Sequence, residues 1–353
     1  MILLVTTNPG LEDLASKEFE EKIGEKVRYE VVAGGRFIVE LSKNSNIEDL
    51  ASKIFSLKTV HRVSLVLSEA NVSADKNSLK TIYDTTKNSE PHIYLNHHTT
   101  FAIRSERIGV HQYTSLDVAK VAGQAVIDAT LEKYGFKPIV NLEYPTVIFD
   151  STVVHGKYFF SLRLSGEESL HKRKYRIYDH PAALKPTLAY SMLMIANLNP
   201  EEVVVDPMCG GGTIAIEAAL NFNVKEVFCI DISPKHLHGA IINAISAGAY
   251  RKIRFILGDV RKLSEIVSTQ ADLIITNPPY GIRLFRREKL KDLYHGFLSS
   301  ALKILSSKGR VVVITSEHSL LKEVATELGY SILLERECMH GNLKVKIMMF
   351  KPM

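Results

Sequence analysis

The spacing of apolar residues changes along the chain and predicts successive groups of secondary-structure elements. Residues 2–67 alternate between strand-like and helix-like runs in the order β-α-β-β-α-β, which is the ferredoxin-like pattern. Asn8-Pro9-Gly10 interrupts the first apolar run, and Ala33-Gly34-Gly35 is typical of a hairpin turn. The expected elements are strands at 2–6, 27–32, 36–41 and 60–67 and helices at 11–23 and 46–55, the second helix capped by Asn46.

A second group of elements follows a polar stretch, residues 70–100, in which the periodicity is weak. Thr114 or Ser115 can cap a helix here, and the acidic Asp117 suits the first turn of that helix. Apolar residues then repeat at intervals of three and four until Gly135, which ends the helix. The strands expected in this group lie at 100–104, 147–154 and 158–164.

The last part of the chain alternates strictly between strand-like and helix-like runs. Val203-Val204-Val205 and Leu273-Ile274-Ile275 are entirely apolar, as strands buried on both faces of a sheet should be. This alternation predicts an α/β domain with a doubly wound, mostly parallel sheet that binds its ligands at the carboxyl ends of the strands. The expected strands are 202–206, 226–231, 253–259, 271–277 and 309–316, followed by an antiparallel pair at 330–335 and 343–350.

These groups predict an order of domains. We expect a ferredoxin-like domain at 1–60, a second α+β domain at 61–165, a basic linker at 166–185 and the α/β domain at 186–353. The linker is either a solvated connector or a strip that lies along a phosphate backbone. Its cations are Lys172, Arg173, Lys174, Arg176 and Lys185, with Tyr175 and Tyr178 between them.

Composition excludes several classes of protein. The chain is 46% hydrophobic and 24% charged, and no run of eighteen apolar residues is present, so we expect no membrane span. The start, Met1–Thr7, lacks a basic leader region. Three widely spaced cysteines suit a reducing compartment, and we expect a cytoplasmic monomer. The net charge of +5 permits a polyanionic partner without requiring one.

The first candidate for chemistry is a glycine-rich loop between an expected strand and an expected helix. The run Asp206-Pro207-Met208-Cys209-Gly210-Gly211-Gly212-Thr213 lets the backbone turn sharply and approach a ligand closely. Gly210-x-Gly212-x-x-Ala215 also satisfies a dinucleotide-binding pattern. The loop alone therefore allows a nicotinamide cofactor, S-adenosylmethionine or only a tight turn.

Acidic residues end the next two expected strands. Asp231 can accept hydrogen bonds from both hydroxyls of a ribose, and Asp259 can accept a hydrogen bond from the amino group of adenine. Either residue alone would more often be a helix cap or an ordinary loop residue. Two acids at successive strand ends after a glycine loop favour an adenosine-containing ligand, and Ile232 and Val260 follow them directly.

The tetrapeptide Asn277-Pro278-Pro279-Tyr280 after the fourth expected strand separates these alternatives. An exocyclic amine on a base is a poor nucleophile because its lone pair is delocalised into the ring. The side-chain oxygen of Asn277 and the carbonyl of Pro278 could each accept one N–H, which directs the lone pair toward a methyl group. Tyr280 could stack on the base. A nicotinamide enzyme has no use for this tetrapeptide, so methyl transfer from S-adenosylmethionine is favoured.

The chain resembles a known family on these motifs. Residues 186–353 are similar to Rossmann-fold amino-methyltransferases, and residues 60–165 resemble the THUMP domain, an RNA-binding module. Together with Asn8-Pro-Gly-Leu-Glu-Asp-Leu14, this layout resembles the tRNA guanine-N2 methyltransferases that act at position 6 of the acceptor stem. The resemblance implies a tRNA substrate. The THUMP-like positions are Phe101-Ala-Ile-Arg104, Arg107, His111, Tyr113–Asp117, Gly123-Gln124, Gly166-Glu167 and Leu170–Arg173.

The expected site residues fall into three sets. The catalytic residues are Asn277, Pro278 and Tyr280. The cofactor-binding residues are Pro186, Thr187, Asp206, Met208, Cys209, Gly210, Gly212, Thr213, Asp231, Ile232, Asp259, Val260 and Asn277. The RNA-binding residues are Arg104, Arg107, His111, Lys172, Arg173, Lys174, Arg176, Arg283, Arg286 and Arg287. We expect no metal site, because His97-His98 lacks partners at ligand spacing, and we expect Cys209 to be a packing residue rather than a nucleophile.

Other functions fit parts of this pattern. The same reaction could act on ribosomal RNA, or on position 10 of tRNA, although the position-10 motif usually begins with Asp rather than Asn277. The chain could also be an RNA-binding partner protein that has lost catalysis, but the intact acids and tetrapeptide argue against this. DNA adenine and protein glutamine methyltransferases use the same tetrapeptide without needing the front half of this chain.

Overall fold

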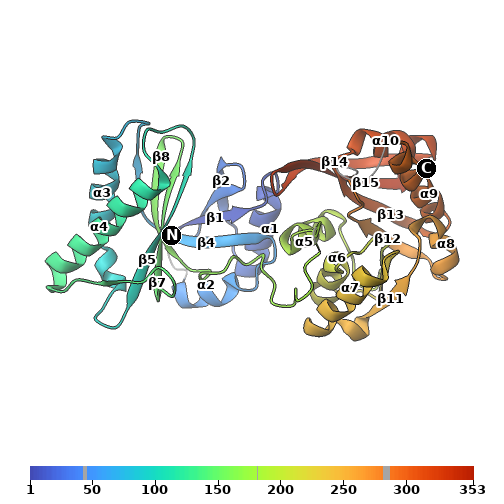
Figure 1. Cartoon of the computed structure of the whole chain (residues 1–353), viewed down its shortest axis with the longest axis horizontal. Coiled ribbons are helices and arrows are strands. Elements are labelled where there is room, and N and C mark those ends of the chain that lie inside the picture. Colours follow the sequence, from blue (N-terminus) through green and yellow to red (C-terminus); the bar gives the residue numbers. More distant parts are fainter. Residues whose placement is uncertain (43–45, 181, 281–286) are drawn as a thin grey trace. The chain divides into compact units, whose positions relative to one another are not determined.

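The computed structural model describes residues 1–42, 46–180, 182–280 and 287–353. The chain forms two compact units (Figure 1). The first unit comprises Met1–Thr7 and Ala15–Leu170, and the second comprises Asn8–Leu14 and His171–Met353. A short segment near the start of the chain thus belongs to the unit that otherwise begins at His171.

The first unit is built on one sheet of eight strands in the order β2-β3-β1-β4-β8-β7-β5-β6. Its first half has the ferredoxin-like order, since β1 lies between β3 and β4 and pairs with both in antiparallel fashion. Its elements are β1 (Ile2–Thr7), α1 (Glu12–Ile23), β2 (Arg28–Ala33), β3 (Arg36–Glu40), α2 (Ile47–Ile54), β4 (Val60–Asn71), α3 (Ser78–Asn88), η1 (Pro91–Tyr94), β5 (Thr100–Ile108), α4 (Ser115–Tyr134), β6 (Ile139–Val140), β7 (Val147–Val154) and β8 (Lys157–Arg163).

Strand β4 joins the ferredoxin-like half of this sheet to the strands that follow it. It pairs with β1 on one side and with β8 on the other, so the expected boundary between residues 60 and 61 falls at the start of a shared strand. Helices α3 and α4 cover the same face of β5, β7 and β8, where Ile82, Val118 and Phe149 share one core (Figure 1).

The ends of α2 and α4 follow the expected signals. Asn46 accepts a hydrogen bond from the backbone N–H of Glu48 at the start of α2. Thr114 and Asp117 form a reciprocal capping box at the start of α4. Gly135 takes a left-handed conformation, with φ of 73°, directly after that helix.

The second unit is a doubly wound α/β domain, as the alternation of apolar runs predicts. Its sheet has seven strands in the order β11-β10-β9-β12-β13-β15-β14, and the pairs from β11 to β13 are parallel. Its elements are α5 (Pro186–Ile195), β9 (Val203–Asp206), α6 (Thr213–Asn221), β10 (Glu226–Asp231), α7 (Pro234–Ser246), η2 (Tyr250–Lys252), β11 (Ile253–Leu257), η3 (Val260–Lys262), α8 (Leu263–Ile266), β12 (Ala271–Thr276), α9 (Arg287–Leu302), β13 (Leu305–Thr315), α10 (His318–Glu327), β14 (Tyr330–His340) and β15 (Leu343–Pro352).

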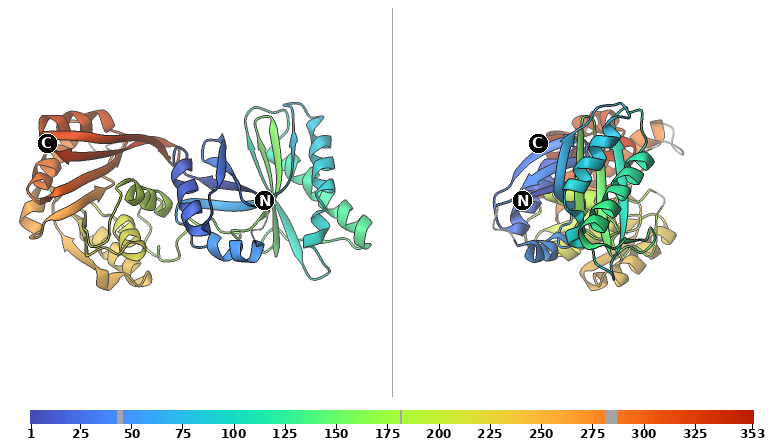
Figure 2. Two further views of the ribbon diagram at one scale, coloured as in Figure 1. Left: turned by 180° about the vertical axis from the view of Figure 1, so that it is seen from behind. Right: turned by 90° about the vertical axis from the view of Figure 1, so that its left-hand side faces the viewer.

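Two cores lie on opposite faces of this second sheet. Helices α5, α6 and α7 pack on one face, where Leu193, Ile216 and Ala240 are buried. Helices α8, α9 and α10 pack on the other face. The long strands β14 and β15, drawn in red in Figure 2, form the expected antiparallel pair around the turn at Gly341. None of the helices within the described ranges is long and apolar enough to cross a membrane.

Two segments differ from their expected structure. The polar stretch 70–100 contains helix α3 and the short helix η1. The linker does not behave as a solvated connector, because Tyr175 is buried and its hydroxyl donates a hydrogen bond to Glu217 on α6 at 2.8 Å. The backbone of Tyr178 forms two hydrogen bonds with the side chain of Asn243 on α7. This part of the expected linker is therefore packed against helices α6 and α7.

Candidate active site

A cavity of about 770 Å³ lies at the carboxyl edge of the parallel strands of the second unit. The loops after β9, β10, β11 and β12 line it, because the carboxyl ends of parallel strands meet at one edge of a sheet. This volume falls within the range of pockets that bind nucleotide-sized molecules. Ten of the expected cofactor residues line it: Asp206, Met208, Cys209, Gly210, Thr213, Asp231, Ile232, Asp259, Val260 and Asn277.

The glycine loop after β9 depends on two left-handed backbone conformations. Gly210 has φ of 52° and Gly212 has φ of 77°, which other residues rarely adopt. A β-carbon at Gly212 would lie only 3.0 Å from the β-carbon of Ala240 on α7. Gly212 thus allows α6 and α7 to pack closely, while Gly210 presents its backbone to the cavity.

Asp231 is held in place by the backbone that surrounds it. Its side chain accepts hydrogen bonds from the N–H groups of Gly210 and Ser233, each at 2.8 Å. These bonds use one lone pair on each oxygen, and a carboxylate has further lone pairs available. The group can therefore accept two hydroxyls from a ligand in the cavity.

Asp206 at the end of β9 is almost completely buried. Its carboxyl accepts a hydrogen bond from the hydroxyl of Thr276 at 3.0 Å. Burial raises the pKa of Asp206 to about 8, and the nearby negative charge of Asp231 acts in the same direction. At neutral pH this carboxyl group is mostly protonated, and a cation bound beside it would favour its ionised form.

Asp259 is paired with a neighbouring cation. Its carboxylate accepts hydrogen bonds from the backbone N–H and from the guanidinium of Arg261 at 3.0 Å. These hydrogen bonds from Arg261 hold the pKa of Asp259 below its ordinary value. A ligand amino group at this position would share the carboxylate with Arg261.

The tetrapeptide begins directly after β12. The side-chain oxygen of Asn277 accepts a hydrogen bond of 2.6 Å from the hydroxyl of Tyr280, and its amide nitrogen lies 3.4 Å from the carbonyl of Ala182. Pro278 is buried and Pro279 is exposed. The ring of Tyr280 lines the cavity but also packs against the hydrophobic core. Both residues that the sequence suggested as acceptors for an amine, Asn277 and Pro278, thus line the cavity.

Three expected cofactor residues are not among the described residues that line the cavity: Pro186, Thr187 and Gly212. Pro186 begins α5, and Thr187 is fully buried. The hydroxyl of Thr187 accepts a hydrogen bond from the side chain of Asn8 at 3.0 Å. This contact fixes the segment Asn8–Leu14 on the second unit.

The cavity also contains residues that carried no signal in the sequence. His180 and His236 form an edge-to-face contact with ring centres 4.3 Å apart. Asp292 comes from α9, and His340 comes from the end of β14. Because these residues lie far apart in the chain and form no motif, only the folded arrangement identifies them. Among the described residues, no group of three or more His, Cys, Asp or Glu side chains is placed to hold a metal ion.

Comparisons with known proteins agree with this architecture. The model of the RMKL-like methyltransferase domain matches residues 173–346, and the THUMP domain model matches residues 76–163. The tRNA (guanine(6)-N2)-methyltransferase of Archaeoglobus fulgidus is 37% identical over 98% of this chain and 91% of its own length. The chain belongs to the family of THUMP-containing tRNA guanine-N2 methyltransferases.

Two further proteins resemble this methyltransferase over nearly its whole length. The tRNA (guanine(6)-N2)-methyltransferase of Methanocaldococcus jannaschii is 30% identical over 97% of this chain and 98% of its own. The crystal structure of TrmN from Thermus thermophilus superposes with a TM-score of 0.82 at 28% identity, covering 100% of this chain and 99% of that one. The expected family and the expected methyltransferase fold are thus confirmed.

The expected RNA-binding cations of the first unit have partners within that unit. Arg104 forms an ion pair with Glu167 at 2.9 Å and donates a hydrogen bond to the carbonyl of Leu142. Arg107 donates a hydrogen bond to the carbonyl of Gly109 and lies 3.1 Å from His111. Both residues are partly buried, and Nε of Arg107 is buried without a hydrogen-bond partner among the described residues.

The cations of the second unit differ in their surroundings. Lys172 and Lys174 of the methyltransferase are exposed, whereas Arg173 is directed inward and pairs with the buried Glu217 at 3.1 Å. Arg176 pairs with Asp179, and Arg287 is exposed at the start of α9. Arg283 and Arg286 lie outside the described residues. The expectation that 172–176 forms a continuous basic strip is therefore wrong at Arg173, because its guanidinium is engaged in a buried ion pair.

Proposed function

We propose that this methyltransferase transfers the methyl group of S-adenosylmethionine to the exocyclic N2 amine of a guanosine in tRNA, at position 6 of the acceptor stem. The observation that carries the proposal is the position of Asn277 and Pro278 at the edge of the cavity, beside Asp206, Asp231 and Asp259. The names and the full-length similarity of the archaeal relatives support the choice of tRNA and of position 6.

The cavity suits S-adenosylmethionine in its acceptors and its apolar walls. Asp231 would accept the ribose hydroxyls, and Asp259 would accept the adenine amino group in competition with Arg261. Ile232 and Val260 line the cavity beside these acids. When bound, the cofactor supplies a methyl group activated on a cationic sulfur, and the ionised form of Asp206 would favour that charge.

The tetrapeptide would prepare the amine for attack. The oxygen of Asn277 and the carbonyl of Pro278 each accept one N–H, so the nitrogen lone pair is no longer shared with the ring. The nitrogen would take the methyl group from the cationic sulfur, which would leave as the thioether of S-adenosylhomocysteine, and the proton released from the nitrogen would pass to solvent. Positive charge on the nitrogen is stabilised by the same two acceptors. No Cys or His side chain acts as a nucleophile in this scheme.

The division of labour follows the two units. The THUMP-containing unit and the exposed cations Lys172, Lys174 and Arg287 would bind the RNA, while the second unit carries the chemistry. The guanine must leave its base pair to reach Asn277, at an unstacking cost of a few kcal/mol. Removal of a base from its stack is the usual solution for enzymes that modify bases.

The experiment that tests this function maps the methylated nucleotide. The purified chain is incubated with S-adenosylmethionine and, in separate reactions, with tRNA transcripts and ribosomal RNA fragments, which are then digested and analysed by mass spectrometry. We expect N2-methylguanosine at position 6 of tRNA. Modification of tRNA at another guanosine would contradict only the position, and modification of ribosomal RNA alone would contradict the substrate.

A further inference from the structure

The hydroxyl of Tyr280 lies between two hydrogen-bond acceptors. It is 2.6 Å from the side-chain oxygen of Asn277 and 3.4 Å from Nδ1 of His340. The rings of Tyr280 and His340 meet edge to face, with centres 6.3 Å apart and an angle of 90° between their planes. A phenol has one proton to donate, so only one of the two acceptors can receive it at a time.

The surroundings of His340 determine which of its ring nitrogens is the acceptor. Its Nε2 lies 3.4 Å from the carbonyl oxygen of Ala183, which can only accept a hydrogen bond. The proton of the neutral ring therefore belongs on Nε2, and Nδ1 is left as an acceptor that faces Tyr280. Burial lowers the pKa of His340, and the positive charge of Lys185 adds to this effect, so the ring is neutral at pH 7.

The hydrogen bond from Tyr280 uses one of the two lone pairs on the Asn277 oxygen, and so weakens it as an acceptor for the proposed reaction. Asn277 is oriented by that bond and by its own contact with the carbonyl of Ala182. Burial also raises the pKa of the Tyr280 hydroxyl, which keeps its proton. The hydrogen bond from an amine to the oxygen of Asn277 is strongest if the Tyr280 hydroxyl no longer donates to that oxygen.

We propose that His340 is a positioning residue for the methyl transfer, acting as the second acceptor for the Tyr280 hydroxyl. With the site free of RNA, the hydroxyl donates to Asn277 and holds its amide in one orientation. When the guanine amine reaches Asn277, the hydroxyl donates to Nδ1 of His340 instead, and the oxygen of Asn277 becomes a stronger acceptor for the amine. This role rests on the proposed function of Asn277 and adds a residue that no motif includes.

Substitutions that separate the two nitrogens of His340 test the role. His340→Asn keeps an acceptor near the position of Nδ1 and should retain most of kcat, whereas His340→Gln should lower kcat roughly tenfold. Affinities for S-adenosylmethionine and tRNA, measured by calorimetry, should change little in both variants. The exposed His295 on α9 provides a matched control, and His295→Gln should behave as the wild type.

The double variant distinguishes positioning from simple structural support. If His340 acts through the Tyr280 hydroxyl, His340→Gln should have no further effect on kcat in a Tyr280→Phe background. The same tenfold loss in both backgrounds would overturn the proposal. The pH profile adds a second readout, because protonation of Nδ1 removes the acceptor. The wild type should lose kcat in the acid range, and His340→Asn should not, with Tyr280 and Lys185 as the titratable neighbours of the ring.

Nitrogen NMR of the full chain labelled in histidine tests the arrangement without any reaction. We expect His340 as the neutral Nε2–H form at pH 7, with an Nδ1 resonance that shifts when tRNA is added to the wild type but not when it is added to Tyr280→Phe. A neutral Nδ1–H form, or an Nδ1 resonance that responds to tRNA equally in both proteins, would refute the role of His340. If the NMR result holds while the chain methylates no guanosine, the proposed function fails and the hydrogen-bond arrangement stands.

Discussion

Three carboxyl groups that line the cavity, those of Asp206, Asp231 and Asp259, have different properties because their surroundings differ. Asp231 receives two backbone hydrogen bonds, Asp259 is paired with Arg261, and Asp206 is buried with hydrogen bonds from the Thr276 hydroxyl and the backbone of Met208. The sequence indicates all three, since each follows a run of strand residues. It does not indicate that the pKa of Asp206 is raised, because that shift depends on burial by distant segments.

Replacement of Asp231 tests the cofactor site directly. Asp231→Ala should weaken binding of S-adenosylmethionine at least tenfold, because two ribose hydroxyls lose a charged acceptor, while tRNA affinity changes little. Isothermal titration calorimetry with each ligand measures both effects. Glu265→Ala, at an exposed acid, controls for the loss of one negative charge. Unchanged cofactor affinity in Asp231→Ala would count decisively against this site.

Asp206 predicts how cofactor binding depends on pH. Its pKa of about 8 means that the fraction in the ionised form rises as the pH increases from 7 to 9. If only the ionised form favours the cationic cofactor, affinity should increase about tenfold over that interval and then level off. Calorimetry at several pH values should show this increase in the wild type but not in Asp206→Asn. An affinity that falls between pH 7 and 8, or an equal rise in both proteins, would contradict the role of Asp206.

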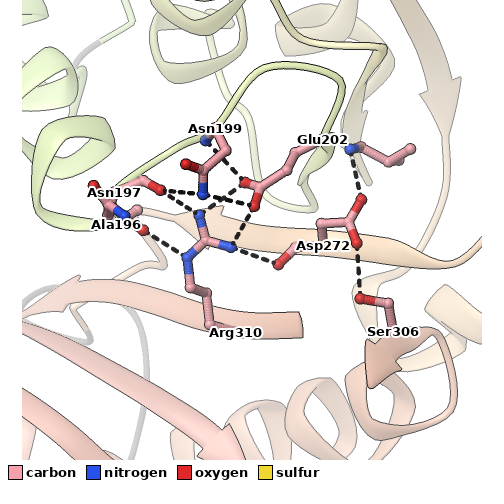
Figure 3. A network of polar contacts seen from close by, with 8 residues as sticks. Ala196, Asn197, Asn199, Glu202, Asp272, Ser306 and Arg310 are labelled. Carbon is pink, nitrogen blue, oxygen red and sulfur yellow. Dashed lines mark hydrogen bonds and ion pairs between the residues drawn. The ribbon is translucent and has the colours of Figure 1, made fainter. Parts of the chain in front are cut away.

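At the scale of elements, the edge of the second sheet opposite the cavity is fixed by one arginine. Arg310 on β13 donates hydrogen bonds to the carbonyls of Ala196, Asn197 and Asp272 and pairs with Glu202 at 2.8 Å (Figure 3). The guanidinium thus joins the end of α5 to β9, β12 and β13. The carboxylate of Asp272 extends the network to Ser306 and to the backbone of β9 (Figure 3).

Substitution of Arg310 should destabilise the second unit without altering its chemistry. Arg310→Met removes the cation paired with Glu202, which keeps only its hydrogen bonds from Asn199, and removes a donor from several carbonyls; this should cost about 3 kcal/mol of unfolding free energy. Arg310→Lys keeps the charge but loses the planar set of N–H donors. Its free energy of unfolding should therefore lie between that of Arg310→Met and that of the wild type. Chemical denaturation followed by tyrosine fluorescence measures the loss. Cofactor affinity of the folded protein should be unchanged, and a variant as stable as the wild type would refute the role of this network.

Elements with strong periodicity could be predicted from the sequence, and others could not. Helix α4 carries a capping box, a long apolar face and a terminal glycine, so its limits follow from local residues. Helix α3 has few apolar residues, and its N-cap residue Asn77 makes no side-chain capping bond, so its stability depends on packing in the core and on contacts with α4 such as the hydrogen bond from Tyr83 to Asp128. Arg173 was misjudged for a similar reason, because its partner Glu217 is 44 residues away.

At the scale of the whole molecule, the two units are not continuous in sequence, because one short N-terminal segment belongs to the C-terminal unit. The segment Asn8–Leu14 belongs to the second unit, where Leu11 is fully buried in the core beside α5. Arg336 on β14 donates hydrogen bonds to the carbonyl of Gly10 at 2.7 and 3.0 Å. A β-carbon at Gly10 would lie 2.5 Å from the carbonyl oxygen of Glu337, so the close approach requires glycine. The apolar periodicity of the first residues does not predict that this segment packs in the second unit.

A substitution in this segment should therefore affect residues 186–353, which are far from it in the sequence but belong to the same unit. Leu11→Ala should destabilise the second unit by about 2–5 kcal/mol, since the unit loses a fully buried side chain. Hydrogen-exchange mass spectrometry should show faster exchange in peptides from 186–353. Leu116→Ala, at a residue that is 61% exposed on α4, is the matched control and should change nothing. Unchanged exchange in Leu11→Ala would mean that the segment contributes nothing to the second unit.

In the proposed reaction, the exocyclic amine of a guanine is the group methylated at Asn277. Two tRNA transcripts that differ only in guanosine or inosine at position 6 test it most directly, because inosine lacks the exocyclic amine and keeps the rest of the base. Methyl incorporation from labelled S-adenosylmethionine should be robust with guanosine and absent with inosine, with similar tRNA affinity for both. Equal incorporation into the inosine transcript would contradict the assignment to N2 and the role given to the tetrapeptide.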